Sequence, residues 1–69
     1  MHKGTVKWFN TKKGYGFIQP ENGEKDIFIH VSQLEKTGLH RLSDGQLVNF
    51  DIFTEVRSGK PAASNVKII

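Results

Sequence analysis

The stretch Lys13-Gly14-Tyr15-Gly16-Phe17-Ile18 decides how this chain folds and which face it turns outward. Alternate residues of a β-strand share a face, so Tyr15 and Phe17 stand side by side while Gly16 and Ile18 occupy the opposite face. A small residue beside an aliphatic one fits the inside of a narrow barrel, where backbones crowd. The stretch therefore predicts a strand with two exposed rings and a lysine at one end.

A second run, Asp26-Ile27-Phe28-Ile29-His30-Val31, repeats this pattern. Burying His30 without a partner would cost free energy, whereas burying Ile27 and Ile29 removes only their contact with water. Phe28 and His30 are therefore expected to face outward. If the two strands are neighbours, they carry a platform of four rings. Flat rings beside positive charge are what single-stranded bases and their phosphates need.

The rest of the chain reads as further short strands. Strands are expected at 3–10, 15–19, 26–31, 46–55 and 62–69, with a helical turn at 32–35 that opens a long loop. Five short strands without an amphipathic helix favour a closed barrel, because closure removes sheet edges. The prediction is an all-β fold, a five-stranded antiparallel Greek-key β-barrel of the oligonucleotide-binding (OB) kind. The expected core is Val6, Ile18, Ile27, Ile29, Leu34, Val48, Phe50, Ile52, Val66 and Ile68. Phe53 has an outward parity and is expected only to pack partially.

Length, charge and composition restrict the function. Sixty-nine residues make one domain, 1–69, with one small core. No run approaches the roughly 20 apolar residues of a membrane span, and no apolar signal segment follows Met1, so a cytoplasmic protein without a membrane partner is expected. The net charge is only +3, but Lys3, Lys7, Lys12 and Lys13 fall in the first 20 residues, which hold no acid. This basic stretch also holds the first aromatic residues, a combination typical of nucleic-acid binding.

Enzymatic chemistry finds no support in the sequence. His2, His30 and His40 are not spaced as metal ligands on one element, and the chain has no cysteine to join them. No glycine-rich loop ends in Lys-Ser or Lys-Thr, and Ser32 lacks a glycine-flanked elbow. The expectation is a protein without catalytic residues, metal or cofactor.

The chain closely resembles the bacterial cold-shock proteins over essentially its whole length. The resemblance rests on motifs in the family's order at 4–10, 13–18, 26–32, 44–46 and 61–66, which include Gly4-Thr5-Val6-Lys7-Trp8-Phe9-Asn10 and Pro61-Ala62-Ala63-Ser64-Asn65-Val66. It implies a cold-shock domain that binds single-stranded RNA and DNA through its aromatic face. It also implies an RNA chaperone, often one that serves in adaptation to cold.

The candidate site follows from the residues and the resemblance together. Base stacking is expected of Trp8, Tyr15, Phe17 and Phe28, with Trp8 assigned mostly from the resemblance, and His30 is expected to contact a base by stacking or by hydrogen bonding. Phosphate contact is expected of Lys7 and Lys13, while Arg57 and Lys60 lie in a turn that could reach the nucleic-acid backbone. Asp26 either accepts hydrogen bonds from a base edge or only caps its strand. Phe9 is divided between core and site.

Two positions depart from the family. Cold-shock proteins usually carry an aromatic residue where this chain has Val31, and another where it has Leu39. Both side chains can touch a base without stacking well on it, so the platform is expected to be about two rings short at its edge.

The expected mechanism is binding of the open strand, which pulls hairpins apart by mass action. A monomer with a mild preference for pyrimidine-rich strands is expected. The alternative is a small barrel whose ring patch grips a peptide. The interleaving of lysines with rings argues against it.

Overall fold

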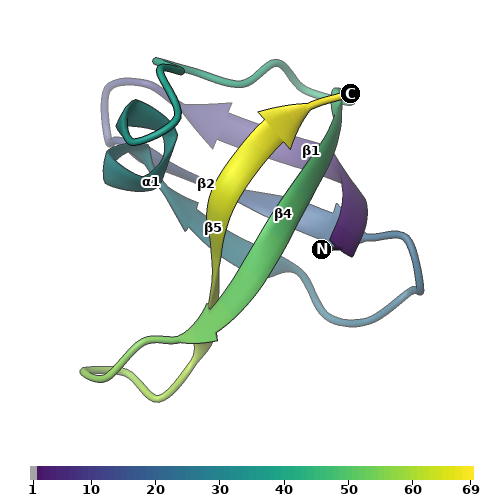
Figure 1. The fold of residues 1–69 in the computed structure, drawn as a ribbon, viewed down its shortest axis with the longest axis vertical. Helices are drawn as coiled ribbons and strands as arrows, with labels where there is room; N and C mark the ends of the chain where they lie inside the picture. The colour runs from purple at the N-terminus through teal and green to yellow at the C-terminus, as the bar shows by residue number, and fades with distance from the viewer. Residues whose placement is uncertain (1) are drawn as a thin grey trace.

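In the computed structural model, which describes residues 2–69, the strands wrap into a barrel (Figure 1). These residues form five strands and one short helix. In chain order they are β1 (His2–Asn10), β2 (Tyr15–Pro20), β3 (Ile27–His30), α1 (Val31–Glu35), β4 (Leu47–Thr54) and β5 (Pro61–Ile68).

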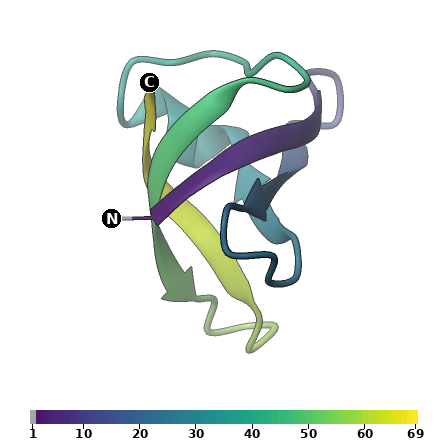
Figure 2. The ribbon, with the colours of Figure 1, turned by 90° about the vertical axis from the view of Figure 1, so that its right-hand side faces the viewer.

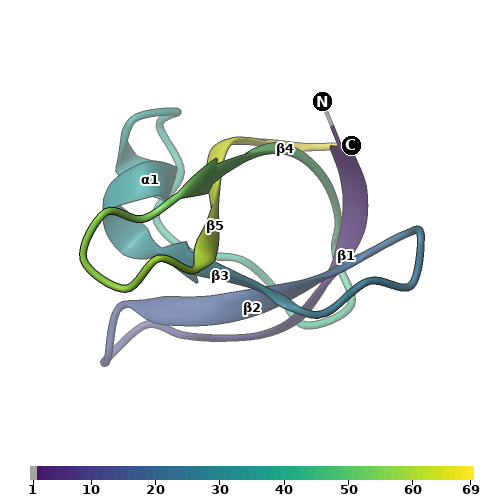
Figure 3. The ribbon, with the colours of Figure 1, turned by 90° about the horizontal axis from the view of Figure 1, so that it is seen from below.

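The barrel closes in the strand order β1-β2-β3-β5-β4, with β4 returning to pair with β1 (Figure 3). The prediction of a five-stranded OB-type barrel is confirmed. Four of the pairings are antiparallel, but β3 and β5 run parallel and meet at the pair Phe28–Ala62. The parallel pair arises because α1 and the long loop carry the chain across the barrel before the β4–β5 hairpin returns it beside β3.

The core is lined by the strand faces that the alternation predicts. Buried residues are Val6, Ile18, Ile27, Ile29, Leu34, Leu42, Val48, Phe50, Ala62, Ala63 and Val66. Ile52 is half-buried and packs against this cluster. Ile68 was expected in the core, and that prediction is wrong, since the side chain is 47% exposed. It pairs with Val48 at the last residue of β5, whereas the β3–β5 register joins Phe28 to Ala62 near the first residue of β5, so among residues 2–69 no β3 residue pairs with Ile68.

The third strand ends one residue earlier than expected. Val31 begins α1, because the His30 side chain caps the helix by accepting the Ser32 backbone N–H. The Val31 backbone N–H instead donates to the Gly14 carbonyl at 2.8 Å. The α1 helix lies beside β3 and β5 and buries Leu34 completely.

The β4–β5 connection extends beyond the barrel (Figure 2). Two backbone bonds close it, from the Glu55 N–H to the Lys60 carbonyl at 2.9 Å and from the Gly59 N–H to the Glu55 carbonyl at 2.7 Å. The hairpin therefore holds Glu55 and Lys60 close to the start of β5, next to the ring-bearing strands.

Candidate nucleic-acid interface

Aromatic side chains occupy matching register positions on the first three strands. Phe17 in β2 pairs with Trp8 in β1 and with Phe28 in β3. Two residues away on each strand, Tyr15 in β2 pairs with His30 in β3. Directly paired residues project from the same face of a sheet. The five rings therefore share the outer face of the barrel, and they are called the ring platform below.

The rings of the platform touch one another in an unbroken chain. The ring centroids of Trp8 lie 5.6 Å from Tyr15 and 5.4 Å from Phe17, both nearly edge-on. Phe28 lies 5.9 Å from Phe17, 5.7 Å from Tyr15 in a stacked arrangement, and 6.3 Å from His30. Ring contacts of this kind are favourable beyond the apolar area they bury. Each ring is thus held in place before any ligand arrives.

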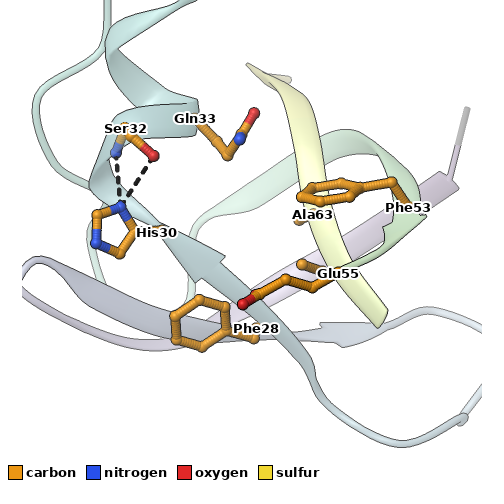
Figure 4. Close-up of a pocket in the computed structure, with 8 residues that line it drawn as sticks. Phe28, His30, Ser32, Gln33, Phe53, Glu55 and Ala63 are labelled. Atoms are coloured by element: carbon orange, nitrogen blue, oxygen red, sulfur yellow. Dashed lines mark hydrogen bonds between the residues drawn. The ribbon is translucent and has the colours of Figure 1, made fainter. Parts of the chain in front are cut away.

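His30 is held in a defined orientation with a defined tautomer. Its Nδ1 accepts the Ser32 backbone N–H at 3.1 Å and lies 2.9 Å from the Ser32 hydroxyl (Figure 4). An atom that accepts a backbone N–H cannot carry the ring proton, so the neutral ring holds its proton on Nε2. His30 can therefore stack on a base and donate a hydrogen bond to a base carbonyl.

The charged candidates lie around the platform. Lys7 Nζ pairs with Asp26 Oδ2 at 3.0 Å, with the two side chains 55% and 31% exposed. An exposed pair of this kind contributes only about 0–1 kcal/mol, so Lys7 can exchange it for a phosphate. In the free protein the Asp26 carboxylate therefore forms an ion pair with Lys7.

The other three candidate cations lie in the β1–β2 turn and in the β4–β5 connection. Lys13 is exposed in the β1–β2 turn, where Asn10 Oδ1 accepts the backbone N–H groups of Lys12 and Lys13 at 2.9 and 3.0 Å. Lys60 lines a hollow of about 300 Å³ together with Phe17 and Phe28. Arg57 is exposed nearer the tip of the same hairpin, outside that hollow.

Three candidates lie apart from the row of rings. Phe9 and Leu39 are half-buried and pack against the core, and the Leu39 backbone N–H donates to the Leu34 carbonyl at 2.9 Å. Val31 is half-buried at the start of α1, close to Gly14. The sequence left Phe9 divided between the core and the binding site, and in the structure it packs against the core. Leu39 approaches the outer surface only with the part of its side chain that the core leaves uncovered.

A prediction follows for the two positions without rings. Val31→Phe combined with Leu39→Phe is expected to tighten binding of long oligo-dT by about 1 kcal/mol or more, because each new ring can stack on a base. Fluorescence titration with oligonucleotides of increasing length measures the gain, which should vanish for strands too short to reach these positions. The exposed His40 is the control. If His40→Ala alone weakens binding as much as a lost ring does, or the double variant binds no tighter, the platform has no such deficit.

The structure also shows a hollow that the sequence reasoning missed. It has a volume of about 380 Å³ and is lined by Phe28, His30, Ser32, Gln33, Phe53, Glu55, Ala62 and Ala63 (Figure 4). The outward parity of Phe53 was the available signal. What the outward side chain of Phe53 lines depends on which strand lies next to β4, and the sequence pattern does not show that neighbour.

Features of other site types are missing from the described part of the chain. Residues 2–69 contain no group of three or more His, Asp or Glu side chains that could hold a metal ion. None of their helices is long and apolar enough to cross a membrane.

A five-stranded barrel of this topology, with rings across β2 and β3, has the architecture of OB-type nucleic-acid-binding proteins. A family model described as the "'Cold-shock' DNA-binding domain" matches residues 2–69. The chain belongs to this family of nucleic-acid-binding proteins and is not an enzyme.

Curated relatives agree with this assignment. The chain is 49% identical over 67 residues to cold shock protein CspA of Rhizobium meliloti, with 97% of each chain covered. It is 53% identical over 64 residues to the cold shock-like protein CspE of Buchnera aphidicola from Acyrthosiphon pisum, and 48% identical over 64 residues to that of Escherichia coli K12. In both comparisons the alignment covers 93% of this chain and 90% of the relative.

Proposed function

We propose that this chain acts in the cytoplasm as a monomeric, single-domain RNA chaperone that binds single-stranded RNA and DNA and serves in adaptation to cold. The observation that carries the proposal is the unbroken contact of five rings, from Trp8 through Phe28 to His30, beside exposed lysines. Such a surface offers stacking faces to several successive bases and positive charge to the phosphates between them.

The mechanism uses the difference between an open strand and a duplex. Each base that stacks on a ring contributes roughly 1–3 kcal/mol, and every base has a flat face to offer. In a duplex those faces are already stacked on neighbouring base pairs. Binding that selects the open strand shifts the hairpin equilibrium by mass action, without nucleotide hydrolysis.

A mild preference for pyrimidine-rich strands is part of the proposal. The His30 Nε2–H is free to donate beside Phe28, and every pyrimidine presents a carbonyl oxygen as an acceptor, whereas adenine presents none. The platform itself remains tolerant, because stacking does not read base edges.

Trp8 provides the direct test. Trp8 is 37% exposed and its ring contacts two platform rings, so single-stranded oligo-dT and oligo-U should strongly quench its fluorescence. Duplex of equal length should have little effect. The affinity should fall with salt by a slope of about −0.7 for each phosphate neutralised, which for a few lysines is a gentle dependence.

The same titration against an RNA hairpin labelled at both ends tests the chaperone step. Saturating protein should open the hairpin in the absence of ATP, while a Phe17→Ala, Phe28→Ala double variant should leave it closed. Equal quenching by single strand and duplex would contradict the stacking mechanism. Tight binding of peptides with no response to oligonucleotides would favour the peptide-binding barrel instead.

A further inference from the structure

The row of register-matched side chains continues past β3. Phe28 pairs with Ala62 in β5, and Ala62 pairs with Phe53 in β4. The side chains of Phe28, Ala62 and Phe53 therefore occupy matching register positions on the neighbouring strands β3, β5 and β4. Phe53 is 38% exposed, although it lies outside the five rings of the platform.

The small side chain of Ala62 leaves the space between the two rings open. Neighbouring strands lie about 4.8 Å apart, so Phe28 and Phe53 start from backbones roughly 9–10 Å apart. A base stacked on the face of Phe28 fits within this span, with the Phe53 ring on its far side. The hollow of about 380 Å³ at this place therefore has room for one base above an alanine floor.

Two polar side chains border the hollow. Glu55 follows the last residue of β4 and reaches toward Phe28 in the view of Figure 4, while Gln33 of α1 lines the opposite side of the hollow with its amide turned away from Glu55. Both are half-buried. No hydrogen bond or ion pair joins the Glu55 carboxylate to any residue from 2 to 69. The backbone bonds of Glu55 with Gly59 and Lys60 fix the root of its side chain.

We propose that this hollow is a base-specific subsite that takes one guanine of a bound single strand, an inference that rests on the proposed function. The Watson–Crick edge of an unpaired guanine presents N1–H and an amino group side by side, and these two donors match the two oxygens of the Glu55 carboxylate. Phe28 supplies the stacking face, and Phe53 closes the far side of the hollow.

The same geometry discriminates against the other bases. Cytosine and adenine each place one amino donor beside a ring-nitrogen acceptor, so only half of the edge suits a carboxylate. Uracil and thymine present a single N–H between two carbonyl oxygens, which the carboxylate repels. The subsite therefore reads one base edge, while the platform beside it tolerates any base.

The test places a single dG at each position in turn of a seven-nucleotide oligo-dT and follows binding by Trp8 fluorescence. One register is expected to bind about tenfold tighter than plain oligo-dT, within the range of a good bidentate contact. Glu55→Gln should bring that register back close to plain oligo-dT, because an amide accepts thymine as readily as guanine. Phe53→Val should weaken the guanine register while leaving plain oligo-dT unchanged.

Glu24→Gln is the matched control, since it removes the same charge from the exposed β2–β3 loop. It should preserve the register preference. If plain oligo-dT binds but no register stands out, the subsite is wrong while single-strand binding stands. A uniform gain for all oligonucleotides with Glu55→Gln would show a carboxylate that merely repels phosphate, which also overturns the subsite. If no oligonucleotide binds, the proposed function and the subsite fail together.

Discussion

Phe28→Ala is expected to leave the barrel folded and to weaken oligo-dT binding by about 1–3 kcal/mol. Ile29→Ala, one residue further on, is expected to lower the free energy of unfolding by about 2–5 kcal/mol. The reason is the alternation of β3. Phe28 contacts Tyr15, Phe17 and His30 on the outer face, whereas Ile29 is 0% exposed inside the barrel.

The size of the domain makes this contrast easy to measure. A chain of this length has a total stability of roughly 3–10 kcal/mol, so Ile29→Ala should leave much of the population unfolded. Urea unfolding and oligo-dT titration of both variants separate stability from affinity, and Phe17→Ala serves as a second platform variant. If Phe28→Ala unfolds the protein while Ile29→Ala is harmless, the two faces of β3 are assigned the wrong way round.

Local periodicity accounts for the part of the structure that the sequence predicts well. The alternation of Tyr15 with Gly16, and of Phe28 with Ile29, assigns the faces of β2 and β3 without knowledge of their neighbours. The same rule does not reach Ile68, because burial at a strand end depends on what covers it. It also misses Leu42, which lies in a loop without any period and is nevertheless buried.

Contacts between distant segments account for the rest. The Lys7–Asp26 pair joins residues 19 apart in the chain, and the hollow beside Phe28 requires β5 to lie between β3 and β4. Neither follows from a pattern within one strand. Ala62 carries no sequence signal of its own, yet its register between Phe28 and Phe53 creates the space for a base.

The other large effect is expected at Gly16. This residue pairs with Phe9 in β1 and Ile29 in β3, where the first two strands approach closely beside a register shift in β1. An added Cβ would fall on the Trp8 carbonyl oxygen and lie 2.7 Å from Phe9 Cα. Both are backbone atoms and cannot rotate away, so β1 itself must move. Gly16→Ala is therefore expected to destabilise the protein by about 3 kcal/mol, the upper end of the usual cost of overpacking.

The displacement should also reach the binding face, because the strand that moves carries Trp8. Under conditions where Gly16→Ala remains folded, its Trp8 emission should shift and its affinity for oligo-dT should fall, although no ring has been removed. Gly23→Ala is the control. Its φ is 81° and a Cβ there meets nothing within 4 Å, so it costs only backbone strain of about 1–2 kcal/mol. Urea unfolding compares the two. If Gly16→Ala proves no more destabilising than Gly23→Ala and keeps full affinity, the close contact of β1 with β2 does not set the position of Trp8.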